Sequence, residues 1–204
     1  MTAAPARRGT RGRGESRLLN AAVGIVLLGA AVGVQSLDMT YNEYKAPLTY
    51  IGGQGEDVDA GRFTVRLKSV TVAKAVEHAE KTVRTDHLFL IADLSAKSKH
   101  KPHRLGSATL LTEDGRKFAA TDRIDNGATI TSKWVQPDIW VSGRYFFEVP
   151  PSSLPGARLI VGMQAKALVE PYEPEVELDL GMDEATADKL VKSPQDVYST
   201  AARK

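Results

Sequence analysis

The sequence predicts an all-β fold: an antiparallel β-sandwich outside the membrane, preceded by one N-terminal transmembrane α-helix. Three observations predict it. A segment near the N-terminus, Leu18–Leu37, carries no charge. From residue 61 onward, short runs alternate apolar and polar residues with turn signals between them, and no long helical period interrupts them. We therefore expect a basic cytoplasmic tail over 1–17, a transmembrane helix over 18–37, a flexible linker over 38–60, the sandwich over 61–180, and a short helix with a tail over 181–204.

The basic tail holds most of the charge asymmetry. Five arginines and one glutamate give residues 1–17 a charge of +4, so the rest of the chain carries −2 of the total of +2. Such a short arm is not the patterned basic surface of a folded nucleic-acid-binding domain, so we expect no nucleic-acid partner. The chain contains no cysteine, which excludes disulfides, thiol catalysis and cysteine-based zinc sites.

The charge-free segment Leu18–Leu37 is long enough to cross a lipid bilayer as a helix, because about 20 residues span ~30 Å. The arginines before it place the N-terminus in the cytoplasm and the later residues outside, in a single-pass protein of the cell membrane. The alternative is a cleaved signal peptide, for which Val34-Gln35-Ser36 is the best cleavage site. Gly29 and Gly33 have the G-x-x-x-G spacing that predicts helix-mediated self-association.

The segment 38–60 is expected to be a linker. Tyrosines favour the membrane interface, and here they are Tyr41, Tyr44 and Tyr50. The glycine cluster 52–55 is not a phosphate-binding loop, because no Lys-Ser/Thr pair follows it and acidic residues do. We therefore expect it to be a flexible tether.

Strands begin at residue 62. Phe63, Val65 and Leu67 alternate with polar residues, and the alternation then changes parity, which predicts a β-bulge near Ser69. Further strand-like runs cover 87–94, 107–112, 116–119, 144–149, 157–163 and 176–180. Asp114-Gly115 predicts a hairpin turn. A short helix is expected over 182–191, and the tail after residue 194 is expected to be loose.

Three of these runs resemble a Gram-positive family of secreted or membrane-anchored immunoglobulin-like domains of unknown function, related to a secreted mycobacterial antigen sandwich. The runs are Ile91–Ser95, Leu110–Phe118 and Ser142–Pro150. The resemblance covers residues 61 to 163 or 180 and implies the fold and the location outside the membrane. It implies no catalytic residue. The sequence departs from the family at the basic segment 97–104 and at the segment 134–140.

The segment 97–104, called here the basic loop, is a candidate anion-binding edge. Its fixed positive charges are Lys97, Lys99, Lys101 and Arg104. Clustered cations attract the phosphate-rich polymers and lipid headgroups found outside the membrane. The alternative is a solvated hairpin loop that only keeps the domain soluble. The loop also has an H-x-x-H spacing, but its cationic neighbours and lack of a carboxylate disfavour a metal ion.

The segment 134–140, called here the aromatic segment, contains both tryptophans of the chain, Trp134 and Trp140. An exposed pair of tryptophans would form a partner-binding site for a protein or a glycan. The alternative is that one ring fills the core of the sandwich and the other covers its end.

The sequence shows no catalytic motif, so we expect no enzyme activity, no cofactor and no metal. Two functions remain. The first is a membrane-anchored, non-catalytic binding or scaffold module with a membrane-protein partner, such as an accessory subunit of an envelope transport or secretion complex. The second is a secreted protein that binds an anionic envelope polymer after signal cleavage.

Overall fold

The computed structural model describes residues 13–35, 46–165 and 170–201. Residues Met1–Tyr44 and Lys45–Lys204 form two compact units. The first unit contains the helix α1, Arg13–Gln35. A helix is therefore confirmed over the described part of the segment expected to cross the membrane, and residues 36 and 37 lie outside the described residues.

No helix in the described ranges is both long and apolar enough to cross a membrane. A Cβ atom added at Gly29 or Gly33 would meet no other atom within 4 Å. Self-association of the helix through these two glycines stays a prediction.

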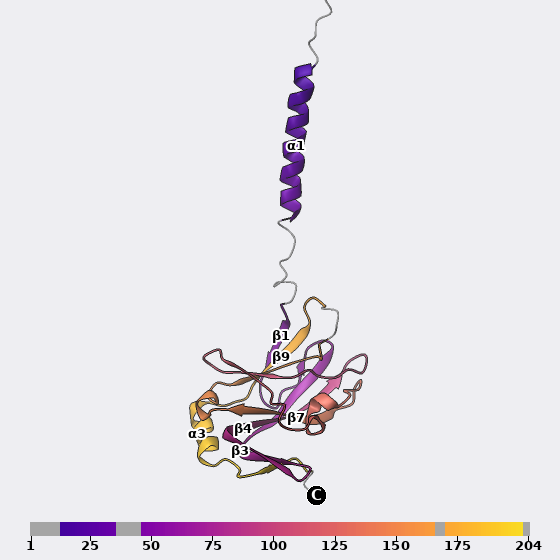
Figure 1. The fold of residues 1–204 in the computed structure, drawn as a ribbon. Helices are drawn as coiled ribbons and strands as arrows, with labels where there is room; N and C mark the ends of the chain where they lie inside the picture. The colour runs from indigo at the N-terminus through magenta and orange to yellow at the C-terminus, as the bar shows by residue number, and fades with distance from the viewer. Residues whose placement is uncertain (1–12, 36–45, 166–169, 202–204) are drawn as a thin grey trace, which may run out of the picture. The chain divides into compact units, whose positions relative to one another are not determined.

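The second unit is a sandwich-like arrangement of two sheets (Figure 1). One sheet has the strand order β1-β9-β8-β5-β6. Its strands are Leu48–Gly52 (β1), Pro174–Asp179 (β9), Arg158–Gly162 (β8), Thr109–Leu111 (β5) and Lys117–Ala119 (β6). The predicted β-sandwich architecture is confirmed at this level.

The other sheet has the order β10-β3-β4-β7, and the short β2 pairs with β3 beside that path. Its strands are Val58–Asp59 (β2), Phe63–His78 (β3), Lys81–Ser98 (β4), Val141–Val149 (β7) and Tyr198–Ser199 (β10). Among the described residues of this unit, the helices are α3, Glu184–Lys192, and three short 3-10 turns, Asn126–Ala128 (η1), Ile130–Ser132 (η2) and Pro151–Ser153 (η3). Most strand pairs are antiparallel, but β1 pairs with β9 and β10 pairs with β3 in parallel.

The main core lies between the two sheets, because alternate side chains of each sheet point to the other. From Leu88 onward, strand β4 is buried on both faces, which explains the continuous apolar sequence Leu88–Ala92. Leu90 and Leu94 enter the main core, whereas Phe89 and Ile91 enter a second, smaller core on the opposite face. The second core is completed by Ile124 from the segment before η1.

Two local sequence signals are confirmed. The pairing of β3 with β4 shifts between Leu67 and Ser69, where the change of alternation predicted a bulge. Residues 112–116 turn between β5 and β6, and Gly115 has φ +82, a conformation that glycine adopts without steric cost. The position of the bulge and of this turn therefore follow from the local sequence.

The structure differs from the expectation of a flexible linker over 38–60. Residues 48–52 form β1, which lies beside β9 (Figure 1), and Tyr50 packs against the main core. The glycine cluster is a packed turn and not a tether. A Cβ atom at Gly52 would lie 2.2 Å from the Cγ2 atom of Val58, so only glycine fits there.

The tail after residue 194, which the sequence predicts to be loose, instead forms hydrogen bonds with the sheet. Backbone hydrogen bonds join Gln195 to Val72 and Lys74, and β10 adds a parallel strand to β3. The hydroxyl of Tyr198 donates to Asp93 at 3.1 Å, and Arg144 donates to the same carboxylate at 2.9 Å. This polar cluster fastens the tail to the sheet.

Candidate functional site

The basic loop and the aromatic segment lie side by side, because backbone hydrogen bonds join them. The amide of Ser98 donates to the carbonyl of Gln136 at 3.0 Å, and the amide of Asp138 donates to Ser98 at 3.1 Å. Val135 and His103 exchange two further bonds, of 2.8 and 3.2 Å. The two candidate sites in the sequence therefore belong to one surface.

Neither tryptophan fills the core. Trp134 is 54% exposed and Trp140 is 36% exposed, and Ile139 between them is 60% exposed. The residue that enters the main core from this segment is Val135, which is fully buried. The alternative of a tryptophan plug is wrong, since Val135 already provides the apolar anchor of the segment.

Each tryptophan ring lies against cationic side chains. Arg66 of β3 and Lys97 of β4 approach the Trp140 ring, with their charged groups 5.0 and 5.2 Å from its centroid. The guanidinium of Arg104 lies 4.9 Å from the centroid of Trp134. These distances are within the ~6 Å range of cation–π attraction. We call the group of Arg66, Lys97, Arg104, Trp134, Ile139 and Trp140 the aromatic–cationic surface.

Two nearby carboxylates neutralise part of the positive charge. Arg66 donates from Nε and Nη2 to Asp57, and this hydrogen bond lowers the pKa of the Asp57 carboxyl below its ordinary value. The pKa of Asp59 is also lowered, first by the backbone amide of Gly61 and then by Lys99, whose Nζ lies 3.3 Å away. Because their pKa is lowered, both carboxylates are ionised at neutral pH. They become protonated only when the pH falls through the lowered pKa.

The remaining cations of the surface have no such partner. Within the described ranges, no carboxylate lies within ion-pair distance of Lys97, Lys101 or Arg104. Of the four residues proposed as an anion-binding edge, Lys99 is paired internally with Asp59, and the charge of Lys97 helps to lower the pKa of Asp57 and Asp59. Lys101 and Arg104 form no ion pair with a described carboxylate. Anion binding by this edge stays a prediction.

Two further titratable side chains, His103 and Tyr145, make contacts inside the fold. His103 packs its ring against Phe63, with ring centroids 5.8 Å apart. Burial raises the pKa of Tyr145, and its neutral hydroxyl donates to the carbonyl of Gly106 at 2.7 Å. No group of three His, Asp or Glu side chains in the described part of the chain is placed to hold a metal ion.

Arg66 is the member of the surface that sequence reasoning missed. In the sequence it is one of several polar residues that alternate along β3, and nothing local distinguishes it. It joins the site because β3 and β4 pair antiparallel, with Arg66 opposite Ser95 and Thr64 opposite Lys97. Arg66 and Lys97 therefore reach the same Trp140 ring because of the register between β3 and β4.

No protein-family model and no curated protein matches the chain. Two solved structures are similar to it. One is the yjhA protein from Bacillus subtilis, with a TM-score of 0.48 and 12% identity over 62% of this chain and 99% of that chain. The other is an uncharacterized beta-sandwich protein from Clostridium difficile 630, with a TM-score of 0.41 and 10% identity over 70% of this chain and 99% of that chain.

Proposed function

We propose that the chain is a membrane-anchored, extracytoplasmic and non-catalytic binding module. In this proposal α1 holds it in the cell membrane, and the aromatic–cationic surface binds an acidic segment of a membrane-protein partner. The immunoglobulin-like class of the sandwich is part of the proposal and rests on the three strand motifs of the sequence. A partner in an envelope transport or secretion complex fits such a module.

The exposure of apolar side chains on α1 supports the anchor. The large apolar residues described there are all at least half exposed: Leu19, Val23, Ile25, Val26, Leu27, Leu28, Val32 and Val34. They lie on every side of the helix, since consecutive positions 25–28 cover a full turn. In this proposal these side chains would contact lipid, although the described part of α1 is by itself below the length and apolarity of a membrane span.

Cysteine labelling tests the orientation. The natural chain has no cysteine, so single cysteines at Gln54 and Thr10 report only their own positions. The arginines before α1 favour a cytoplasmic N-terminus. A membrane-impermeant thiol reagent is therefore expected to label the Gln54→Cys variant in intact protoplasts, and the Thr10→Cys variant only after lysis. Labelling of Thr10→Cys in intact protoplasts would reverse the proposed topology.

The observation that carries partner binding is the exposure of Trp134, Ile139 and Trp140 on a segment held by four backbone hydrogen bonds. Aromatic and arginine side chains are enriched at binding hot spots. A segment that is already fixed loses little conformational entropy when it binds. The unpaired cations Lys97, Lys101 and Arg104 add attraction for a partner with acidic residues.

Site-specific crosslinking in intact cells tests this function. A photoreactive amino acid at Ile139 is expected to form a discrete adduct with a membrane protein, because this side chain is 60% exposed in the aromatic segment. The same amino acid at Glu80, in the exposed turn between β3 and β4, is the matched control and should form none. Immunoblotting and mass spectrometry of the adducts are the measurement.

The charge dependence is tested in the same assay. Replacing Lys97 and Lys101 by glutamate in the Ile139 crosslinking variant is expected to remove most of the adduct, because like charges would then face each other. The charge-conserving replacement of both residues by arginine should keep it. Equal yields at positions 139 and 80, or an adduct unaffected by charge reversal, would exclude this surface as the acidic partner's site.

A further inference from the structure

Two lysines from different strands and turns converge on one serine of β7. The Nζ atom of Lys68 donates to the hydroxyl of Ser142 at 2.8 Å, and the Nζ atom of Lys133 donates to the carbonyl oxygen of the same residue at 2.6 Å. The hydroxyls of Ser142 and Ser95 lie 2.9 Å apart. We call the group of Lys68, Ser95, Lys133 and Ser142 the lysine–serine cluster.

The two serines lie on the face of the sheet that is turned away from the main core. Leu94 and Ala96 of β4 enter that core, so Ser95 between them points to the other face. Ser142 of β7 pairs with Ser95, so both hydroxyls are on the same face. Ser95 is buried and Ser142 is exposed, so a ligand reaches the cluster at Ser142.

The bulge in β3 places the first lysine. The pairing of β3 with β4 shifts between Leu67 and Ser69, so Lys68 is the extra residue, without a partner on β4. A bulge redirects the side chains of its strand. Here the Lys68 side chain extends past β4, which lies between β3 and β7, and reaches Ser142.

A close approach of η2 to β7 places the second lysine. A Cβ atom at Gly143 would lie 2.7 Å from the Cβ atom of Ile130, so a larger residue would push η2 away from the strand. Ile130 is fully buried in the main core, which holds η2 in place. Lys133 follows η2 directly, and its amide donates to the carbonyl of Ile130 at 3.0 Å. Its ammonium group is therefore held at the edge of β7, beside Ser142.

The positive charge of the cluster is not neutralised within the fold. Among the described residues, no carboxylate lies within ion-pair distance of Lys68 or Lys133. Asp93, two residues before Ser95 on β4, is already bound by Arg144 at 2.9 Å. Two ammonium groups that bind the same serine repel each other, and an anion bound between them would offset this repulsion.

We propose that the lysine–serine cluster binds the phosphoryl group of a phosphate monoester. Such a group carries about 1.5 to 2 negative charges at pH 7 and three acceptor oxygens, which matches two ammonium groups and the hydroxyl of Ser142. Ser142 donates to this ligand while the buried Ser95 donates to Ser142, so every hydroxyl proton has an acceptor. A carboxylate fits less well, because it has one charge and two oxygens.

This site goes beyond the protein-binding function, because none of its residues belongs to the aromatic–cationic surface. Phosphorus NMR of glycerol 3-phosphate tests it on the full chain in phosphatidylcholine nanodiscs. We expect a saturable broadening of the glycerol 3-phosphate signal at neutral pH, and none with empty nanodiscs. Inorganic phosphate should compete, and acetate should compete roughly tenfold more weakly because of its smaller charge.

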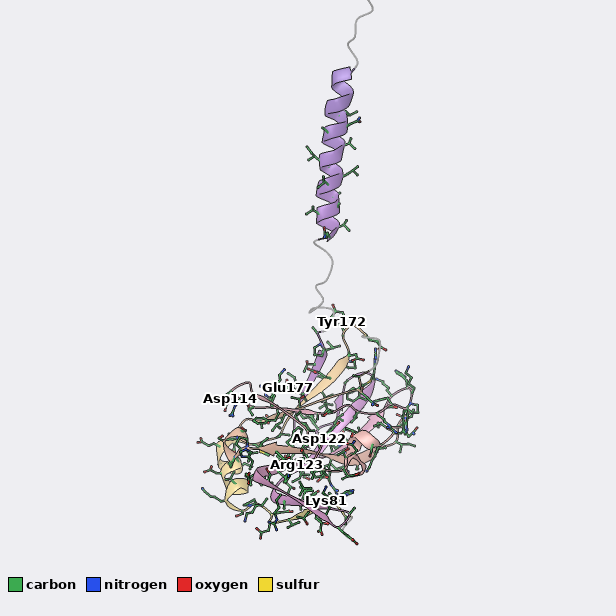
Figure 2. All side chains as sticks on the ribbon, viewed as in Figure 1. Lys81, Asp114, Asp122, Arg123, Tyr172 and Glu177 are labelled. Atoms are coloured by element: carbon green, nitrogen blue, oxygen red, sulfur yellow. The ribbon has the colours of Figure 1, made fainter. Side chains whose placement is uncertain are left out.

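Variants of the cluster locate the site. Lys68→Gln and Lys133→Gln are each expected to weaken binding about fivefold, the loss of one exposed charge, and Ser142→Ala by a similar factor. All three side chains are exposed, so the melting temperature should not change. Lys81→Gln is the matched control and should bind like the parent chain. Lys81, labelled in Figure 2, is exposed and begins β4, whereas Ser95 lies near the end of that strand.

The same titration distinguishes a lipid headgroup from a soluble source of the phosphoryl group. Nanodiscs that contain phosphatidic acid present the phosphate monoester at the membrane surface, and nanodiscs with an equal surface charge from phosphatidylglycerol present only a diester. Loss of the broadening with phosphatidic acid alone would assign the site to a lipid headgroup. Equal broadening in both would assign it to a soluble phosphate monoester.

The proposal is overturned if glycerol 3-phosphate shows no saturable broadening, or if acetate competes as well as inorganic phosphate. Binding by the Lys68→Gln and Lys133→Gln variants as tight as that of the Lys81→Gln control also overturns it. Crosslinking from Ile139 reads out the protein-binding surface separately, so failure of one site is distinguishable from failure of the other.

Discussion

Replacing Phe147 by alanine is expected to lower the free energy of unfolding of the sandwich unit by about 3–5 kcal/mol. Phe147 lies on β7, is fully buried and pairs with Leu90 across the sheet. Its removal leaves a cavity between the two sheets, where the neighbouring side chains belong to different strands and cannot collapse together. Chemical denaturation of the fragment 45–204, followed by far-UV circular dichroism, measures the loss.

The fragment starts at residue 45 because β1 belongs to the sandwich, so a start near residue 56 would remove a strand that pairs with β9. Ile139→Ala is the matched control, since that side chain is 60% exposed and its loss should change the stability little. Equal stability of the Phe147→Ala variant and the parent fragment would contradict the place of Phe147 in the core.

Replacing Asp93 by alanine is expected to cost about 2–3 kcal/mol and to release the C-terminal tail. The Asp93 carboxylate accepts hydrogen bonds from Arg144 and Tyr198, and without it a half-buried guanidinium loses its only ion-pair partner among the described residues. Arg144 also donates to the carbonyl of Thr200 at 3.1 Å. The attachment of the tail to the sheet therefore depends on the Asp93 carboxylate, which lies far from the tail in the sequence.

Hydrogen exchange measures the release. In the parent chain the amide of Thr200 donates to Glu77 at 2.9 Å and should be protected, whereas in the Asp93→Ala variant it should exchange quickly. Asp196→Ala is the matched control, because Asp196 pairs with Lys74 at the surface and its loss should leave Thr200 protected. Unchanged protection in the Asp93→Ala variant would show that the polar cluster does not hold the tail.

The strands that the sequence predicts well are those whose partners and faces follow from local alternation. Phe63, Val65 and Leu67 repeat with period two, and all three enter the main core. The hairpin between β3 and β4 escaped prediction because Ala79 and Glu80 occupy its turn with φ +47 and +66. Asparagine and glycine usually occupy such positions, so this pair carries no turn signal.

The strands β1 and β10 could not be predicted because each pairs with a partner more than 100 residues away in the chain. Leu48 lies opposite Pro174, and Tyr198 lies opposite Val76. Both strands are short, and no turn residue links either of them to its partner. The strands β9 and β3, with which they pair, are in place only when the rest of each sheet has formed.

The sequence predicts the basic loop and the tryptophans as two separate candidate sites. The basic loop and the tryptophans stood out by composition, but their joining depends on the hydrogen bonds between Ser98 and the aromatic segment. The internal pairing of Lys99 with Asp59 could not be predicted either, because Asp59 lies in the segment expected to be a free linker.

The placement of β10 also protects the protein against aggregation. Before the residues that pair with β10, the strand β3 runs through Val70-Thr71-Val72-Ala73, a stretch of high β-propensity with no charge, and Gln195 lies opposite Ala73. Backbone bonds to Gln195 occupy the carbonyl of Val72 and the amide of Lys74, which would otherwise offer a template to the same stretch of another molecule. Proteolytic trimming of the last ten residues is therefore expected to expose the backbone groups of Val72 and Lys74 at this edge and to promote aggregation, although it removes no residue of the main core.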